Sequence, residues 1–497
     1  MCSRWTTNLL IAAVVFSDAA AQQPPKLVPN PSHAIRDTRG GGGAAFEISS
    51  AILKQTRHIS VALPASFAQS PAGRRYPVTV VFDGEGYLAP AAAVADELTR
   101  NGQIPESIIV AIENEDPFQG RVHDLTPPGL SVSGSGLNEG GDQFLDFIEK
   151  ELLPAVDKQF RGGPPRAMIG HSSGAILAIW AAATRPNFRA VVAIDAPVTL
   201  SDNWLAKRLT ARATSDTTPL RFSYYSARFP WPDSEWAALS TTAPKTWKIH
   251  REKLEREGHE TAFMIGAYLG LREVYGDYSR FAAPEVPTTS ILPYYTSVSA
   301  TFGAPVIPPQ RIVRDVLDDL VMEGRGPEAR NAYRLLASSY GAPNDSATLL
   351  TDIARIEREP PPKETVESLM ATPAPTPEEA RAFIGEWVGD AWQSQNAPRS
   401  GKTVLRIKVV DGKVVAERED PNAPPAFRVR QFTYLKVTPQ GLTFGMMNGM
   451  RPRGFWLSEG ILKGDTLSGK QRWGGINFKD PSGVPADEAG FRFVRRK

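Results

Sequence analysis

The sequence has 497 residues, of which 41% are hydrophobic and 22% are charged. A chain of this length exceeds what one hydrophobic core supports, so two or three domains are expected. Its 56 basic and 54 acidic residues nearly cancel, and no basic tail or stripe stands out, which argues against a nucleic-acid partner. After the first residues, no stretch approaches the roughly 18 uncharged residues that cross a bilayer, so no membrane anchor is expected.

The first residues follow the order of a secretory signal. Arg4 gives a positive start, residues 9–16 form an apolar run, and small residues precede Gln22. We therefore predict a signal peptide over 1–21 and a periplasmic or secreted protein; the alternative is a buried N-terminal helix. The one cysteine, Cys2, lies in this segment, so the rest of the chain could form no disulfide. The Pro- and Gly-rich residues 22–44 are predicted to be a flexible N-terminal segment.

Residues 45–303 alternate between short apolar runs and longer amphipathic segments. The run 59–63 alternates as in a strand, and 78–82 and 108–112 are continuous runs rich in β-branched residues, as in strands buried on both faces. Segments 89–100 and 142–160 predict helices. The pattern favours βαβ units and a mostly parallel sheet, that is, an α/β fold. The charged segment 245–257, which contains His250, is also predicted to be helical, with that histidine solvated.

The strongest chemical signal lies in residues 166–177. It contains the sequence Gly-His-Ser-Ser-Gly, in which the first serine is Ser172. A Gly-x-Ser-x-Gly sequence between a strand and a helix places its serine on a sharp turn, for which the glycines leave room. Both flanks fit, since residues 167–169 end an apolar run and 175–183 favour a helix. Ser172 is therefore the predicted nucleophile, with the side chain of His171 pointing away from it into the packing.

Two backbone N–H groups are expected to stabilise the negative charge that develops on the substrate oxygen. One is predicted at Ser173, directly after the nucleophile and at the positive start of a helix. The second is predicted at Gly84, in the glycine-containing segment 80–87, although that segment could also be a plain tight turn. Glu85 beside it is a candidate substrate contact.

A serine hydrolase also requires a histidine base and a carboxylate that orients it. In a fold with this nucleophile turn the chain order is serine, acid, histidine. The acid is expected after the strand near 220–225, where we prefer Asp233 to Glu235; either could instead be a charge at a helix start. His259 follows in the correct order and is the predicted base. His123 is the second choice and another candidate substrate contact.

Several separate motifs, in this order, resemble the "putative esterase" family, which includes esterase D-like and enterochelin esterase-like enzymes. The matching segments are 57–64, 76–84, the Arg-x-x-Asp-Leu-Thr-Pro segment 121–127 (there a strand end), Gly-Gly-Asp at 140–142 and Gly-His-Ser at 170–172. The resemblance covers about residues 45–303. It implies an α/β-hydrolase with its site at the carboxyl ends of the strands, which cleaves a small-molecule carboxylic ester and needs neither a metal nor another cofactor.

One position departs from the family pattern. The family places its histidine a few residues before a Leu-Pro pair, but here Pro287 or Thr288 stands at that place, ahead of Leu292-Pro293. No histidine follows His259. The sequence therefore supports a serine carboxylic-ester hydrolase that uses Ser172, or a hydrolase-fold binding protein that has lost the triad histidine. A third alternative is an acyltransferase or peptidase on the same fold. Neither the particular ester nor the oligomeric state can be predicted.

The remainder of the chain predicts two further units. Residues 304–358 carry apolar residues at helical spacing and are predicted to form a helical hairpin, followed by a Pro-rich linker over 359–376. Residues 377–497 predict a short helix, opened by the capping box at 376–379, and then short antiparallel strands with a hairpin turn at Asp411-Gly412. Phe383 to Trp387 resembles the opening of lipocalin-like barrels, so a small β-barrel-like domain is expected. Its tryptophans are interpreted as core residues.

Overall fold

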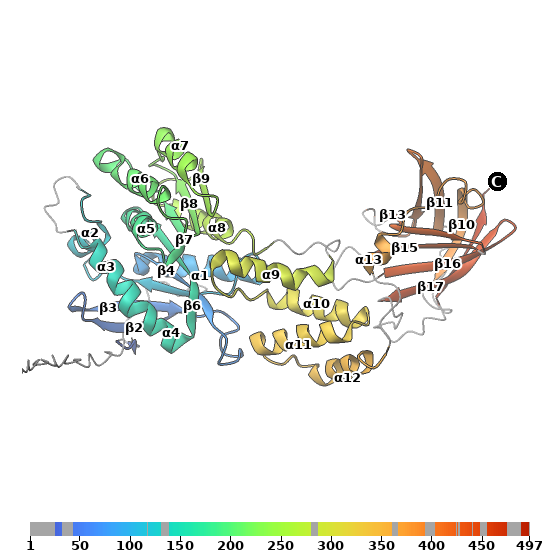
Figure 1. The fold of residues 1–497 in the computed structure, drawn as a ribbon, viewed down its shortest axis with the longest axis horizontal. Helices are drawn as coiled ribbons and strands as arrows, with labels where there is room; N and C mark the ends of the chain where they lie inside the picture. The colour runs from blue at the N-terminus through green and yellow to red at the C-terminus, as the bar shows by residue number, and fades with distance from the viewer. Residues whose placement is uncertain are drawn as a thin grey trace, which may run out of the picture.

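The computed structural model describes residues 25–31, 43–116, 118–130, 139–279, 287–359, 366–392, 403–423, 425, 428–439, 441–447, 455–474 and 489–496. The predicted signal peptide and most of the predicted flexible segment 22–44 lie outside these residues, as does most of the segment between 359 and 366. Two sheets and a group of helices make up the described part of the chain (Figure 1).

The first sheet is mixed, with strand order β1-β2-β3-β5-β4-β6-β7-β8-β9. Strands β5, β4, β6, β7, β8 and β9 are parallel, whereas β1, β2 and β3 add antiparallel pairs at one side. Every residue of β4, β5 and β8 is buried, as expected for strands covered on both faces. The strands are β1 (Val28–Pro29), β2 (Gly43–Ser50), β3 (Gln55–Ala62), β4 (Tyr76–Val81), β5 (Ile108–Ile112), β6 (Gly162–His171), β7 (Phe188–Ile194), β8 (Leu220–Ser226) and β9 (Trp247–Lys253).

Helices cover both faces of this sheet (Figure 1). One face packs against α3 (Gly141–Phe147), the π-helical segment η1 (Ile148–Leu152), α4 (Leu153–Phe160), α5 (Ser173–Thr184), α6 (Leu200–Ala213) and α7 (Asp233–Thr242). The other packs against α1 (Gly84–Arg100) and α8 (Ala262–Val274). The helices α9 (Thr288–Phe302), α10 (Gln310–Met322), α11 (Gly326–Tyr340) and α12 (Ser346–Ile356) extend the hydrophobic cluster on this side. The two short helices are α2 (Gln119–Leu125) and α13 (Val366–Met370).

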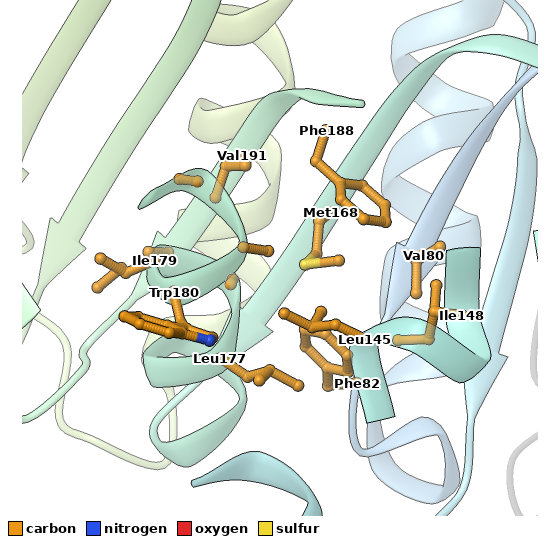
Figure 2. Packing of buried hydrophobic residues seen from close by; sticks show 14 of the residues in the cluster. Val80, Phe82, Leu145, Ile148, Met168, Leu177, Ile179, Trp180, Phe188 and Val191 are labelled. Carbon is orange, nitrogen blue, oxygen red and sulfur yellow. The ribbon is translucent and has the colours of Figure 1, made fainter. Parts of the chain in front are cut away.

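The core beneath the nucleophile turn is formed by residues of β4, β6, β7, α3, η1 and α5. Figure 2 shows Met168 of β6 between Phe188 and the side chains that rise from the helices, with Phe82 close to Leu145. Phe82 is almost fully buried and also lies against the ring of Phe144, with 6.2 Å between centroids. Burial of a phenylalanine of this kind contributes about 1.5–3 kcal/mol, so the end of β4 is held firmly in place.

Three elements differ from their predictions. Residues 247–253, predicted to be helical, form the edge strand β9, because their backbone pairs with β8 along its whole length. The Arg-x-x-Asp-Leu segment forms the helix α2 and not a strand end. The expected helical hairpin at 304–358 contains three helices, α10 to α12, because Gly341 ends α11 and the chain then turns into a further amphipathic segment.

The second sheet is antiparallel and curls into a half-barrel beyond the helices α9–α13 (Figure 1). Its order is β13-β12-β11-β10-β18-β17-β16-β15-β14. Asp411-Gly412 joins β11 to β12 as predicted, and Trp387 is fully buried in its core. The side chains of Thr376 and Glu379 form the reciprocal bonds of a capping box, but turns follow it and not the predicted helix. The strands are β10 (Gly385–Trp392), β11 (Thr403–Val410), β12 (Lys413–Glu419), β13 (Val429–Gln431), β14 (Tyr434–Thr438), β15 (Gly441–Met447), β16 (Phe455–Lys463), β17 (Thr466–Gly474) and β18 (Gly490–Arg495).

Candidate active site

Ser172 lies on the sharp turn between β6 and α5. Its backbone has φ 56° and ψ −120°, a conformation that L-residues rarely adopt, and its N–H donates to the carbonyl of Ile194 over 3.0 Å. The turn is tight because Gly170 has no side chain: a Cβ there would lie 2.1 Å from the carbonyl oxygen of Gly174. The Gly-x-Ser-x-Gly sequence therefore has the steric role that the sequence analysis gave to it.

An imidazole lies next to this serine. The Nε2 atom of His259 is 3.1 Å from the Ser172 Oγ, and its Nδ1 atom is 2.6 Å from an oxygen of Asp195. His259 belongs to the loop between β9 and α8, and Asp195 directly follows β7. The ends of three parallel strands, β6, β7 and β9, thus bring the serine, carboxylate and histidine together. This is the arrangement in which a carboxylate orients a histidine that faces a serine hydroxyl.

Asp195 is fully buried and completely hydrogen-bonded. Its second oxygen accepts the backbone N–H groups of Ala227, Arg228 and Phe229 at 2.7–2.8 Å. Burial acts to raise the pKa of Asp195, but the bonds from the Phe229 N–H, His259 and the other two amides outweigh it and hold that pKa below the usual range. The carboxylate is therefore ionised at neutral pH and fixed in direction.

The prediction of Asp233 as the acid differs from the structure. Asp233 begins α7, its side chain is 94% exposed, and it pairs with Arg251 at 2.6 Å. The alternative, Glu235, accepts a long hydrogen bond from Asn203. The loop after β8 does reach the site, but it contributes backbone amides to Asp195 and not a carboxylate of its own.

The two predicted oxyanion amides, Ser173 and Gly84, are the first residues of α5 and α1. N–H groups in the first turn of a helix have no acceptor within the helix, and the helix dipole makes this end positive. The segments before and within these two helices pack closely, since a Cβ at Gly174 would lie 3.0 Å from the Cβ of Phe82 and 3.3 Å from an oxygen of Asp83. A larger residue at Gly174 would separate the two helix starts.

Arg121, on α2, also reaches this region, and the sequence analysis gave it no role of its own. Its guanidinium donates to both oxygens of Asp83 at 2.6 and 2.9 Å and to the Ser173 Oγ at 3.3 Å. Burial alone would lower the pKa of Arg121, but the Asp83 carboxylate raises it above its usual value. A fixed positive charge therefore lies one residue from Ser172. The signal in the sequence was the place of Arg121 at the start of the Arg-x-x-Asp-Leu-Thr-Pro motif.

The candidate substrate contacts have partners within the protein. Glu85 accepts hydrogen bonds from the backbone and side chain of Asn114 at 3.2 and 2.7 Å. His123 lies 3.0 Å from Asp124, which also pairs with the buried Arg57. Among the described residues, no hydrogen bond joins either side chain to Ser172.

Neither a metal cluster nor a membrane-spanning helix is found in the described part of the chain. Those residues include no group of three or more His, Cys, Asp or Glu side chains that could hold a metal ion. Among the same residues, no helix is both long enough and apolar enough to cross a membrane.

Comparison with known proteins also indicates an esterase. Residues 50–267 match the model of the family "Putative esterase". The resemblance inferred from the sequence motifs is therefore confirmed. The siderophore triacetylfusarinine C esterase of Aspergillus fumigatus is 34% identical over 140 residues, which are 26% of this chain and 46% of that protein. The chain thus matches about half the length of this curated relative.

Among solved structures, an IroE-like serine hydrolase from Shewanella oneidensis is 27% identical, with a TM-score of 0.48, over 59% of this chain and 96% of that one. The siderophore hydrolase EstA from Aspergillus nidulans is 17% identical, with a TM-score of 0.39, over 49% of this chain and 97% of that one.

Proposed function

We propose that this protein is a serine carboxylic-ester hydrolase of the α/β-hydrolase fold, in which Ser172 is the nucleophile, His259 the base and Asp195 the acid. Membership of residues 50–267 in an esterase family supports the general class. The observation that carries the assignment of residues is the unbroken hydrogen-bond chain from Asp195 through His259 to the Ser172 hydroxyl.

The chemistry follows from the direction of each bond. Asp195 is ionised and accepts from Nδ1 of His259, which leaves Nε2 without a proton and able to accept the proton of the Ser172 hydroxyl. The serine oxygen attacks the ester carbonyl as it loses that proton. The resulting oxyanion would be held by the amides of Ser173 and Gly84.

The imidazolium then donates its proton to the leaving alcohol, and an acyl-enzyme remains on Ser172. A water molecule, deprotonated by the same imidazole, attacks this acyl group, and the serine regains its proton as the acid product leaves. Each step uses only groups of this chain and water.

The alternative, a binding protein without a triad histidine, depended on the departure at residues 287–288. Thr288 begins α9, and its hydroxyl lies 3.1 Å from Asp319, in a buried region of the helical extension. Because His259 occupies the position beside Ser172, the departure at Thr288 gives no reason to expect an inactive site. This argument favours the hydrolase.

We propose an ester within a siderophore as the substrate class. Support comes from the relative of Aspergillus fumigatus, whose name specifies a siderophore esterase. Two features of this site fit a large polar ester with cyclic groups: the Arg121 guanidinium beside Ser173, and the half-buried ring of Phe229, edge-on to His259 at 5.4 Å. We further propose that the protein acts after export, in the periplasm or outside the cell.

The first experiment compares the purified protein with Ser172→Ala. The substrates are p-nitrophenyl acetate and a panel of ester-linked and amide-linked siderophores. We expect the wild-type protein to cleave the aryl ester and the ester-linked siderophores, and Ser172→Ala to retain less than about 1/10⁴ of that rate. An organophosphonate should add to the wild-type protein once, at Ser172. Equal rates for the two proteins would refute the role of Ser172, and cleavage of the aryl ester alone would refute the siderophore class.

A further inference from the structure

A second histidine lies against the catalytic one and has no step in this mechanism. The Nε2 atom of His171 is 2.7 Å from the backbone carbonyl oxygen of His259, and the two rings lie 4.6 Å apart. The Nδ1 atom of His171 is 2.9 Å from the hydroxyl of Tyr87. Only 3% of His171 is exposed, so these two partners, and not water, satisfy its nitrogens. The prediction that this side chain points away from the serine into packing omitted both of these bonds.

The chemistry of the partners fixes the tautomer of His171. A carbonyl oxygen can only accept, so Nε2 must carry a proton. In a neutral imidazole, Nδ1 is then an acceptor, and it accepts a hydrogen bond from the hydroxyl of Tyr87. The chain of donors therefore runs from Tyr87 through His171 to the backbone of His259. Burial and the nearby carboxylates raise the pKa of Tyr87 to about 12, so its hydroxyl keeps the proton that it donates.

Tyr87 also contacts α8, the helix that follows the loop of His259. Its ring stacks on Phe263 with 3.9 Å between centroids and 11° between planes. Phe263 lies on α8, four residues after His259. The loop that carries the base is thus held on one side through its carbonyl and on the other through the start of α8, and both contacts end on Tyr87.

We propose that His171 and Tyr87 are positioning residues, which hold the main chain of His259 so that its ring meets Ser172. This inference rests on the proposed function. Asp195 fixes the ring of His259 through Nδ1, but this bond does not itself hold the main chain of His259. The bond from His171 is a second, independent restraint, on the main chain. With both restraints, the 3.1 Å contact to the Ser172 hydroxyl is set before substrate arrives.

The electrostatic surroundings suit this role. His171 faces Tyr87 on α1, His259 on its loop, Asp195 at the end of β7 and Asp83 at the end of β4. Burial, with the adjacent imidazole, lowers the pKa of His171 against the opposing effect of its bond to the His259 carbonyl and of the carboxylates. A neutral ring at this place does not repel the imidazolium that His259 becomes during the reaction.

The test compares three substitutions with two controls. His171→Leu removes the donor, His171→Gln keeps an N–H group of similar reach, and Tyr87→Phe removes one hydroxyl while its ring stays on Phe263. His250→Gln, on the edge strand β9, and Tyr268→Phe, on the outer part of α8, are the matched controls. For each we would measure kcat and KM for the aryl ester and the second-order rate of organophosphonate addition to Ser172.

For His171→Leu we expect a fall of about 10- to 100-fold in kcat and in the labelling rate, with KM nearly unchanged, because a displaced base costs rate and not binding. His171→Gln should recover part of this loss, and Tyr87→Phe should lose about threefold to tenfold. The controls should stay within about twofold of the wild type. In nitrogen NMR of the wild type at neutral pH, His171 should have a protonated Nε2 and an unprotonated Nδ1.

The outcomes separate this inference from the function on which it rests. If Ser172→Ala keeps the activity, the proposed function is wrong. If Ser172→Ala is inactive but His171→Leu and Tyr87→Phe match the wild type, the positioning role is wrong. Equal losses in His171→Leu and His171→Gln would also overturn it, since packing alone would then explain the effect. If the His171 variants fail to fold, Tyr87→Phe decides, because its only change is one hydroxyl.

Discussion

The molecule contains two nine-stranded sheets, which differ in where residues other than glycine adopt a positive φ. In the first sheet, Asp83, Ser172 and Asp195 follow the neighbouring strands β4, β6 and β7, and all three have a φ between 51° and 56°. In the described part of the second sheet, the one residue other than glycine with a positive φ is Asp411, in a hairpin turn. In the first sheet three such residues follow neighbouring parallel strands, while Lys54, between β2 and β3, reverses the chain as Asp411 does in the second sheet.

This difference follows from the two topologies. The carboxyl ends of parallel strands meet at one edge, so the turns that leave them converge on one site. Adjacent antiparallel strands end at opposite edges, and a two-residue turn needs left-handed conformations only to match the twist of the strands. Strain at a site costs about 1–3 kcal/mol per residue and is retained where the surrounding packing enforces it. The buried Phe82 and the glycines around Ser172 provide that packing in the first sheet.

The largest expected effect distinguishes the buried carboxylate from the exposed one. Asp195→Asn should lower kcat for the aryl ester about 10⁴-fold, because the amide favours the wrong tautomer of His259. Asp233→Asn removes an exposed ion pair with Arg251 and should leave kcat within about twofold. Steady-state kinetics on the two variants measures this contrast. A greater loss in Asp233→Asn would restore the acid that the sequence predicted.

The next effect compares two glycines, one from each sheet. In Gly170→Ala the new Cβ would lie 2.1 Å from a backbone oxygen of α5, so the turn must shift, and we expect about 3 kcal/mol of destabilisation together with loss of activity. In Gly412→Ala nothing lies within 4 Å, and only the positive φ of 76° is unfavourable, which costs about 1 kcal/mol and leaves activity intact. Urea unfolding of both variants gives the comparison. Equal destabilisation would mean that the nucleophile turn is no tighter than a hairpin.

The close approach of Ser172, its glycines and His259, which we propose as nucleophile turn and base, could be predicted from the sequence by a turn motif and by chain order. Ser172 lies in a turn motif whose spacing is fixed by sterics, and His259 is in the chain order that the fold requires. The predicted strands 59–63, 78–82 and 108–112 lie on β3, β4 and β5 for the same reason, since alternation and β-branched runs are local patterns.

The proposed acid, Asp195, could not be predicted from the sequence in this way. Asp195 follows a fully apolar run, 190–194, and has the same local signal as any carboxylate after a strand. Only the structure shows that the loop after β8 folds back to donate three amides to it. Likewise, the charged segment 247–253 has helical composition, and pairing with β8 overrides that preference. Contacts between segments distant in sequence decide both cases.

A smaller effect concerns the strain at Ser172 itself. Ser172→Gly should abolish ester cleavage but raise the stability of the folded protein by about 1 kcal/mol, because glycine adopts φ 56° and ψ −120° without penalty. Ser172→Ala is the matched control, since it removes the same hydroxyl and keeps the strain. Thermal unfolding should place the glycine variant above both the alanine variant and the wild type. Identical melting temperatures for the glycine and alanine variants would mean that the turn stores no strain.

The smallest expected effect is the acid sensitivity that His171 adds to the first sheet. Its pKa is lowered in the folded protein, chiefly by burial, so the folded state disfavours the protonated form relative to the unfolded chain. The stability contributed by neutral His171 is therefore complete above about pH 6.5, the usual value for histidine, and is lost as the pH falls towards the lowered folded pKa. Asp195, whose pKa is also lowered, follows the same sign at a more acidic pH, below about 3.9. Melting temperatures measured from pH 8 to pH 5 should decline less steeply for His171→Gln than for the wild type, with His250→Gln, on the edge strand β9, as the matched control. A wild-type slope in His171→Gln would mean that this ring is not held neutral by the site.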